Sequence, residues 1–502
     1  MIQKDPEFSP GSLFKLRRLP DAPSAPLWRW FYPLLALGFA ARTTIAVVSD
    51  VPLHFDEVMQ YLEQAHRIVF GYGIVPWEYR EGTRSWIVPG FISGILSGLQ
   101  SLGMTRPAIY VPAVKIVFCI LSMTIPAGMY LFGRIYLGER SARFALVLGC
   151  FWYELVLFAH KPLTTFIATA LIFLALSLAV ERNRFITALI AGATVALAIA
   201  VRIQMTPVLI VAMAVIFFSY SARQRLAFGV GITLAILSIG LLDQYTWGHW
   251  WHSYYRNIEL NLFQGVAAGF GTEPIFRYLA WLLIASGGLF YLALASAATR
   301  WRSNWFLLTM TILILGVHSA IGHKEYRFIF MLLPFWLMML AYLLAAIKPW
   351  QARLLASATA FVAIMGITHQ LPRQEKVYLA IGYTVHDFLD RRSDRQAYLH
   401  LNKDESFTGL IDLANHWSIS GGYYYLHRKL PIYDQSLFQT HLRDKPLDKY
   451  ASHILTKKDV ESIPGFRPDR TFISSNDGEL RLWQRIEKDV NQYYWNSYEI
   501  NQ

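Results

Sequence analysis

The sequence predicts an α-helical polytopic membrane protein that ends in a small α/β domain. The chain of 502 residues is 54% hydrophobic and only 16% charged, whereas charged residues usually reach about 25% in soluble proteins. Apolar stretches long enough to cross a bilayer recur along residues 28–369. After them the composition becomes mixed and polar, which is typical of a domain outside the membrane.

The apolar stretches predict about eleven membrane helices, because roughly 20 apolar residues cross the ~30 Å hydrocarbon layer. Residues 1–27 are polar and rich in proline, and we expect a cytoplasmic segment there, followed by an uncleaved first anchor. The predicted helices, which together form a transmembrane domain over 28–369, cover residues 28–48, 108–132, 143–159, 163–180, 186–201, 207–220, 226–242, 277–298, 305–321, 328–347 and 354–369.

The distribution of Lys and Arg predicts the orientation. If residue 1 is cytoplasmic, the inner loops carry eleven Lys and Arg in 33 residues, whereas the long outer loops 50–107 and 243–276 carry five in 92. The positive-inside rule then places these long loops and the tail on the exported side. Residues 86–103 could form a twelfth span or a re-entrant or interfacial helix, and Pro89 favours the second interpretation.

The tail, 370–502, is predicted to be an exported α/β domain. Its pattern is helical over 375–389 and strand-like over 471–474 and 479–484. The last two stretches flank Asn476-Asp477-Gly478, and Asp-Gly between alternating residues indicates a β-hairpin.

Several function classes lack support in the sequence. The net charge of +12 is explained by topogenic Lys and Arg and by anionic lipid, and no nucleic-acid motif accompanies it. Cys119 and Cys150 both lie in apolar stretches, so neither a disulfide framework nor a thiolate metal site is predicted. There is no Asp-x-Asp motif and no other cluster of metal ligands, so we expect no metal and no cofactor.

The first outer loop, residues 49–107, concentrates polar side chains that packing alone does not explain. Apolar residues at helical spacing predict a short amphipathic helix over 56–69 that lies at the membrane surface and ends before Gly71. Acidic residues could merely cap this helix, but a cap needs only one of them. The polar residues of this group are His54, Asp56, Glu57, Gln60, Glu63 and His66, with Arg84 further along the loop.

Cations stand at the outer ends of other predicted helices, namely Lys161, Arg202 and those of the sequence His323-Lys324-Glu325-Tyr326-Arg327. Ionisable groups at membrane depth cost at least about 2.5–3.5 kcal/mol, so they usually face a cavity and a partner. Internal salt bridges or snorkelling are the structural alternatives. A carboxylate that faces such cations suits transfer from a phosphate-bearing donor, since a base deprotonates the acceptor and cations hold the phosphate.

With these residues in hand, the chain resembles the Alg9-like mannosyltransferases (GT22-type), which build GPI anchors and dolichol-linked oligosaccharides on a GT-C fold. Three blocks of residues, in the same order over 54–330, carry the resemblance. They are His54-Phe55-Asp56-Glu57-Val58 with Gln60, Glu63, His66, Gly71, Trp77-Glu78, Arg84-Ser85 and Pro89; Asp243, Tyr245, Gly248, Trp250, Asn257, Asn261, Gly271 and Tyr278; and His323-Lys324-Glu325-Tyr326-Arg327-Phe328.

The resemblance implies an inverting glycosyltransferase that uses a polyprenyl-phosphate sugar, with mannose as the expected sugar and a glycan or glycolipid as the acceptor. It places the catalytic base on Asp56, with Glu57 as the second choice. Where that family usually has proline between the His and the Asp, this chain has Phe55, which bears on the loop geometry. The residues expected to bind donor or substrate are His54, Gln60, Glu63, Arg84, Arg202, His323, Lys324 and Arg327.

Three further expectations complete the hypothesis. The chain contains no Asn-x-Ser/Thr site, which favours a bacterial inner membrane over the endoplasmic reticulum. We expect a monomer that contacts membrane lipid, with its active site on the exported side. The alternative function is a transporter or flippase for a lipid-linked or anionic sugar, although the sequence lacks the internal repeat that transporters commonly show.

Overall fold

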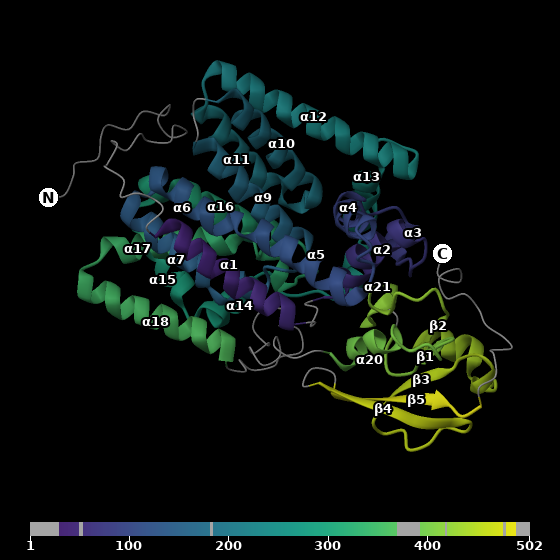
Figure 1. Cartoon of the computed structure of the whole chain (residues 1–502). Helices are drawn as coiled ribbons and strands as arrows, with labels where there is room; N and C mark the ends of the chain where they lie inside the picture. Colours follow the sequence, from purple (N-terminus) through teal and green to yellow (C-terminus); the bar gives the residue numbers. More distant parts are fainter. Residues whose placement is uncertain are drawn as a thin grey trace.

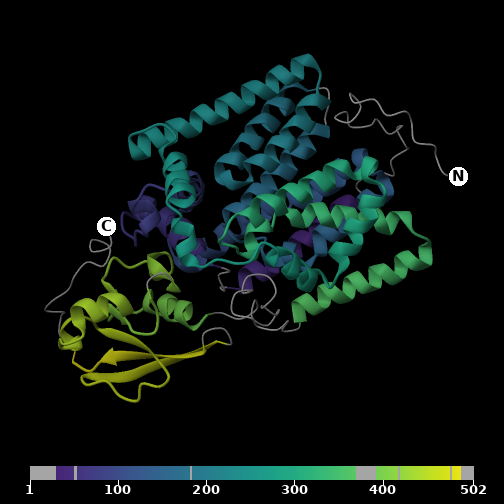
Figure 2. The ribbon, with the colours of Figure 1, turned by 180° about the vertical axis from the view of Figure 1, so that it is seen from behind.

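A computed structural model describes residues 30–49, 54–180, 184–368, 392–416, 419–474 and 478–487. It has two parts, a large body of packed helices and a smaller domain with a β-sheet that lies against one end of that body (Figures 1 and 2). This division confirms the predicted architecture. The predicted helix at 375–389 lies outside the described residues.

The helices of the large body follow the apolar stretches of the sequence. Two predicted spans are interrupted, since 108–132 divides at Met123 and 143–159 divides at Trp152. The long helices are α1 (Phe31–Val48), α5 (Pro107–Ser122), α6 (Thr124–Tyr136), α7 (Glu139–Phe151), α9 (Thr164–Val180), α10 (Phe185–Val201), α11 (Thr206–Ser219), α12 (Ala222–Trp247), α14 (Arg277–Ser286), α15 (Leu289–Thr299), α16 (Trp301–Ala320), α17 (Leu332–Ala346) and α18 (Pro349–Thr368).

Within the described residues, four stretches are long and apolar enough to cross a membrane, or six if each of two bent pairs is one span. These pairs are α10 with the helical stretch 203–219, bent by 117°, and α14 with α15, bent by 105°. The second bend falls at Gly287 and Gly288, whose φ angles of 56° and 85° favour glycine. The protein is an integral membrane protein, and the count of eleven spans stays a prediction.

The first outer loop folds as a helix, but the predicted position of this helix at the surface is wrong. A π-helical turn, η3 (Glu57–Leu62), continues into α2 (Glu63–Phe70), which ends at Gly71 in the left-handed conformation. All residues from Glu57 to His66 are buried. The cause is the cover provided by α4 (Ile87–Ser101) and by the sheet domain, which turn both faces of the helix into interior. Residues 86–103, for which a twelfth span and an interfacial or re-entrant helix were the alternatives, contain α4, a helix of 15 residues, and the choice between them stays a prediction.

Short helical elements connect the long helices, and several carry polar residues identified in the sequence. They are α3 (Trp77–Arg80), α8 (Tyr153–Leu157), η4 (Ile203–Met205), α13 (His252–Ile258), η5 (Glu259–Phe263), η6 (Val266–Phe270) and η7 (Tyr326–Ile329).

The smaller domain is a five-stranded mixed sheet in the order β2-β1-β3-β5-β4, with parallel pairs β2-β1-β3 and antiparallel pairs β3-β5-β4. The predicted hairpin strands pair as β4 and β5, which confirms that prediction, while 475–477 lie outside the described residues. The elements are α20 (Ser393–Leu401), β1 (Leu410–Asp412), α21 (Gly422–Leu426), β2 (Ile432–Asp434), α22 (Gln435–Leu437), η9 (Phe438–Leu442), η10 (Leu447–Lys449), β3 (His453–Lys457), β4 (Phe466–Ser474) and β5 (Gly478–Arg485).

Close backbone contact holds α12 against α10. A Cβ atom on Gly231 would lie 2.0 Å from the carbonyl oxygen of Leu189, and one on Gly192 would lie 2.1 Å from that of Phe228. Small residues at such crossings let membrane helices approach closely. Glycine is therefore required at these two positions by packing rather than by backbone conformation.

The variant Gly231→Ala tests this packing. It should lower the free energy of unfolding by about 1–3 kcal/mol, because the methyl group overlaps a backbone carbonyl. The measurement is the thermal unfolding temperature of the full chain in detergent. Gly229→Ala, two residues away on the same helix with open space at its Cβ, is the control. Equal unfolding temperatures for both variants would contradict the contact.

Candidate active site

The centre of the candidate site is the carboxylate of Asp56, which three side chains hold in place. Arg327 Nη1 lies 2.9 Å from Oδ2, Gln60 Nε2 donates to Oδ1 at 2.9 Å, and His54 Nδ1 lies 3.1 Å from Oδ1. Burial alone would raise the pKa of this carboxyl, but His54, Arg327 and Arg84 together hold it well below its usual value. Asp56 is therefore an ionised carboxylate in a fixed orientation.

Arg327 is itself held by Glu325 in the loop before α17. Its Nε and Nη2 lie 2.5 and 3.1 Å from the two Glu325 oxygens, and His323 Nε2 lies 3.0 Å from Glu325 Oε1. The pKa of Glu325 is lowered by the charge and hydrogen bonds of Arg327 and by His323, against the effect of burial. An internal salt bridge, one of the structural alternatives that the sequence left open, is therefore present between Glu325 and Arg327, and Arg327 Nη1 binds Asp56.

Lys324 does not join this network. Its Nζ donates to the carbonyl oxygens of Glu273 at 3.1 Å and Ile321 at 2.5 Å. Glu57 also points away from Asp56, and its Oε2 lies 3.5 Å from the buried Lys161 Nζ. The two neighbouring carboxylates at the start of η3 thus bind different partners.

Arg84 and Arg202 line a common cavity of about 50 Å³ between the first outer loop and the bend after α10. The Nε atom of each is buried and has no hydrogen-bond partner among the described residues. The Arg202 guanidinium lies over the Phe328 ring at 4.8 Å from its centroid. The other polar residues around this cavity are Tyr61, Thr83, Ser85, Thr164, Gln204, Ser253, Tyr254 and Asn257.

Buried guanidinium N–H groups without a partner are costly, and an anionic ligand would satisfy them. Arg84 lies close enough to Asp56 to lower its pKa, which links this cavity to the carboxylate. The arrangement can hold an anion beside an ionised base.

Sequence reasoning missed the contribution of Glu78. Gln60 Nε2 donates to Glu78 Oε1 at 2.6 Å as well as to Asp56, so Glu78 fixes the amide that orients the central carboxylate. The Trp77-Glu78 pair belongs to the first block of motif residues, and that was the signal available in the sequence.

Glu63 lies apart from the Asp56 cluster and binds the main chain of α21 in the sheet domain. Its carboxylate accepts hydrogen bonds from the backbone N–H groups of Tyr423 at 3.1 Å, Tyr424 at 2.8 Å and Ile74 at 2.8 Å. Burial raises the pKa of Glu63 to about 7, although these three bonds lower it. Glycine is required at position 422, because a Cβ atom there would lie only 2.6 Å from Glu63 Oε2.

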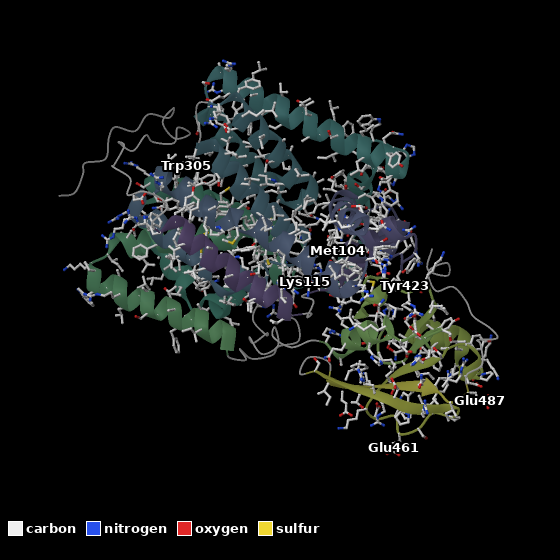
Figure 3. The ribbon with its side chains drawn as sticks, in the orientation of Figure 1. Met104, Lys115, Trp305, Tyr423, Glu461 and Glu487 are labelled. Carbon is white, nitrogen blue, oxygen red and sulfur yellow. The ribbon has the colours of Figure 1, made fainter. Side chains whose placement is uncertain are left out.

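Two more contacts support this junction, which is marked by the Tyr423 label in Figure 3. His66 Nε2 lies 3.0 Å from His427 Nδ1, and the Tyr110 hydroxyl on α5 donates to the carbonyl oxygen of Tyr424. His66 and Glu63, which the sequence grouped with the catalytic residues, thus connect the first outer loop to the sheet domain.

Among the described residues, no group of three or more His, Cys, Asp or Glu side chains is arranged to hold a metal ion. The site geometry instead combines a carboxylate, several guanidinium groups and hydroxyl or amide side chains.

The arrangement of a helical membrane body, a carboxylate on its first outer loop and a sheet domain over that loop defines a GT-C type membrane protein. ArnT from Cupriavidus metallidurans, in a crystal structure with undecaprenyl phosphate, has the same fold with a TM-score of 0.57 at 10% sequence identity, covering 92% of this chain and 99% of ArnT. Its apo crystal structure gives a TM-score of 0.56.

The particular family follows from the sequence itself. The family model of the Alg9-like mannosyltransferase family matches residues 33–427, so the chain belongs to this family. This confirms the resemblance and the GT-C fold that it implied.

Curated relatives in the family are GPI mannosyltransferases. The chain is 27% identical to the mouse GPI alpha-1,2-mannosyltransferase 3 over 332 residues, which are 63% of this chain and 60% of the relative. It is 24% identical to the human protein over 355 residues (67% and 62%) and 26% identical to the Yarrowia lipolytica GPI mannosyltransferase 3 over 332 residues (60% and 60%). The chain therefore matches about three fifths of the length of these relatives.

The Glu63 junction yields a stability prediction. Glu63→Gln should lower the unfolding temperature of the full chain in detergent. Both carboxylate oxygens of Glu63 accept hydrogen bonds from backbone N–H groups, and the amide nitrogen that replaces one of them cannot accept such a bond. A lost bond that leaves a buried donor unpaired costs about 1–3 kcal/mol. The control is Glu81→Gln in the same loop, since Glu81 forms an exposed ion pair with Arg256 and such pairs contribute little to stability. If both variants have the same unfolding temperature as the wild type, Glu63 does not hold the junction.

Proposed function

We propose that the protein is an inverting mannosyltransferase that moves mannose from a polyprenyl-phosphate donor to a glycan or glycolipid acceptor. The observation that carries the proposal is the ionised Asp56 carboxylate, which Arg327 and Gln60 fix. It lies beside a cavity lined by two arginines whose Nε atoms have no hydrogen-bond partner among the described residues. Membership in the Alg9-like family supports the reaction type and the sugar.

In the proposed reaction Asp56 is the general base. It takes the proton of the acceptor hydroxyl as the hydroxyl oxygen attacks the anomeric carbon of the sugar. The bond between this carbon and the donor phosphate oxygen breaks, and the electron pair leaves with the phosphate. Attack opposite to the leaving group inverts the anomeric configuration. Arg327 orients this base. Glu57, which faces Lys161, is the second candidate for the catalytic base.

We assign the donor phosphate to Arg84 and Arg202. Each presents a buried Nε–H group without a hydrogen-bond partner in the part of the chain that the structure describes. Arg327, in contrast, is occupied by two carboxylates and Lys324 by carbonyl oxygens. Charge-assisted hydrogen bonds from guanidinium groups would stabilise the negative charge that develops as the phosphate leaves. The structural neighbour ArnT was crystallised with undecaprenyl phosphate, which is the class of lipid proposed here as the carrier.

The remaining expectations belong to the same proposal. The Lys and Arg distribution supports an exported active site and an exported sheet domain. The helix α2, which follows the segment of Asp56, packs against α21 of the sheet domain (Figure 1). A bacterial inner membrane and a monomer stay predictions. The family does not favour the transporter alternative, which predicts binding without turnover.

The first test of the proposal is sugar transfer by Asp56→Asn. Purified full-length protein receives polyprenyl-phosphate-[³H]mannose and a membrane lipid extract, with EDTA present. Loss of a general base should lower the transfer rate by on the order of 10²–10⁴ while donor binding is largely retained. Glu57→Gln distinguishes the two candidate bases, and Glu81→Gln controls for loop folding.

If Glu57→Gln loses the transfer rate and Asp56→Asn keeps it, the assignment of the base is wrong. If the wild type transfers no sugar with any lipid extract or lipid-phosphate sugar, the mannosyltransferase proposal is wrong, and transport or binding becomes the function to measure.

The phosphate assignment predicts a separate kinetic effect. Arg84→Gln and Arg202→Gln should each lower kcat/KM for the donor roughly 10- to 100-fold, because each removes a charge-assisted hydrogen bond to the phosphate. Arg106→Gln, an exposed arginine on the same loop outside the cavity, is the matched control. Unchanged donor kinetics in both cavity variants would place the phosphate elsewhere.

A further inference from the structure

A second cavity, of about 560 Å³, lies between the helical body and the sheet domain. One wall comes from Val47 in the last turn of α1 and from Pro107, Ala108 and Val111 at the start of α5. The opposite wall comes from α20 and β4. Figure 3 places Lys115, which also lines the cavity, at the boundary between the two parts.

The depth of this cavity in the membrane follows from its walls. Both α1 and the 30-residue stretch 107–136 are long and apolar enough to cross a bilayer. The cavity is lined by the end of the first and the beginning of the second, and ends of spans lie where hydrocarbon gives way to headgroups. The wall formed by α1 and α5 therefore lies at the depth of the lipid chains next to the headgroups. The wall formed by α20 and β4 belongs to a domain outside the membrane.

The charged residues among the described lining of the cavity are all cations. Lys403 and Arg470 come from the sheet domain, and Lys115 comes from α5. Lys403 is exposed, and its ammonium group has no ion-pair or hydrogen-bond partner among the described residues. Arg470 Nη1 lies 3.3 Å from His400 Nδ1, and the other nitrogen of that ring lies 3.6 Å from Asp469. No Asp or Glu occurs among the described lining residues.

We propose that this cavity binds the phosphate-bearing headgroup of an anionic membrane lipid. Lys403 and Arg470 contact the phosphate from the sheet domain, and the lipid chains lie along the apolar start of α5. Charge complementarity supports an anion, and the position at the end of two spans supports a lipid rather than a free ion.

The site is separate from Asp56, and its assignment does not rest on the proposed transferase reaction. Val111 and Lys115 also line a small inner cavity that contains Glu57 and Lys161. A lipid in the cavity of about 560 Å³ therefore lies next to the cavity lined by Glu57, and it contacts both the helical body and the sheet domain.

Native mass spectrometry of the full-length protein in detergent tests the proposal. Phosphatidylglycerol should bind, and phosphatidylcholine of the same chain length should bind more weakly. The double variant Lys403→Gln with Arg470→Gln should weaken phosphatidylglycerol binding on the order of 30-fold, since each cation near the surface contributes about 1 kcal/mol. Lys457→Gln with Arg467→Gln removes the same charge from exposed positions of the same domain outside the cavity, and it should leave binding unchanged.

A steric variant separates the lipid from free phosphate. Ala108→Trp fills the apolar wall and keeps every cation, so it should weaken phosphatidylglycerol binding as well. Inorganic phosphate at millimolar concentration should not displace the lipid. The proposal is overturned if both double variants lose binding equally, because the effect is then only net charge. It is also overturned if Ala108→Trp has no effect while inorganic phosphate competes, because the site then takes the free ion.

Discussion

The ion pair between Asp56 and Arg327 is the constraint on which the site depends. It joins the first outer loop to the loop before α17, across 271 positions of sequence, and Arg327 is only 9% exposed. Removing one partner of such a buried pair leaves an uncompensated charge, which typically costs about 3–5 kcal/mol. The helices between the two loops must therefore pack so that Asp56 and Arg327 stay within contact distance. Glu325 adds the second contact to Arg327, so this guanidinium cannot turn toward another ligand.

The same constraint explains why the arginines have different roles. Arg327 is neutralised by two carboxylates, whereas Arg84 and Arg202 carry Nε atoms that no described group satisfies. Arg202 stands at the break between α10 and η4, where the chain bends by 117°. A charge at such a break can face the interior of the protein instead of lipid, which is where charges at membrane depth are tolerated. The bend therefore lets Arg202 line the cavity instead of facing lipid.

Hydropathy predicted the helical body well because apolar length is set by the bilayer and is visible in single sequences. The residues of the site were also visible, since six polar side chains in one short loop are not explained by packing. Their directions were not visible. Asp56 and Glu57 are neighbours and point about 100° apart on a helix, and the π-helical turn η3 shifts the register that a regular helix predicts. The sequence therefore grouped Glu63 with Asp56, although the two carboxylates bind different parts of the protein.

The junction with the sheet domain could not be predicted for a different reason. Glu63 accepts hydrogen bonds from main-chain N–H groups of Tyr423 and Tyr424, and such donors exist at nearly every residue. The only signal of this contact in the sequence of α21 is Gly422, where an added Cβ atom would collide with Glu63. This junction also explains how the polar helix that follows Asp56 can be buried at all. Water would otherwise satisfy Glu63 and His66, and α21 replaces that water with fixed donors, so the sheet domain helps to define the position of the loop that carries Asp56.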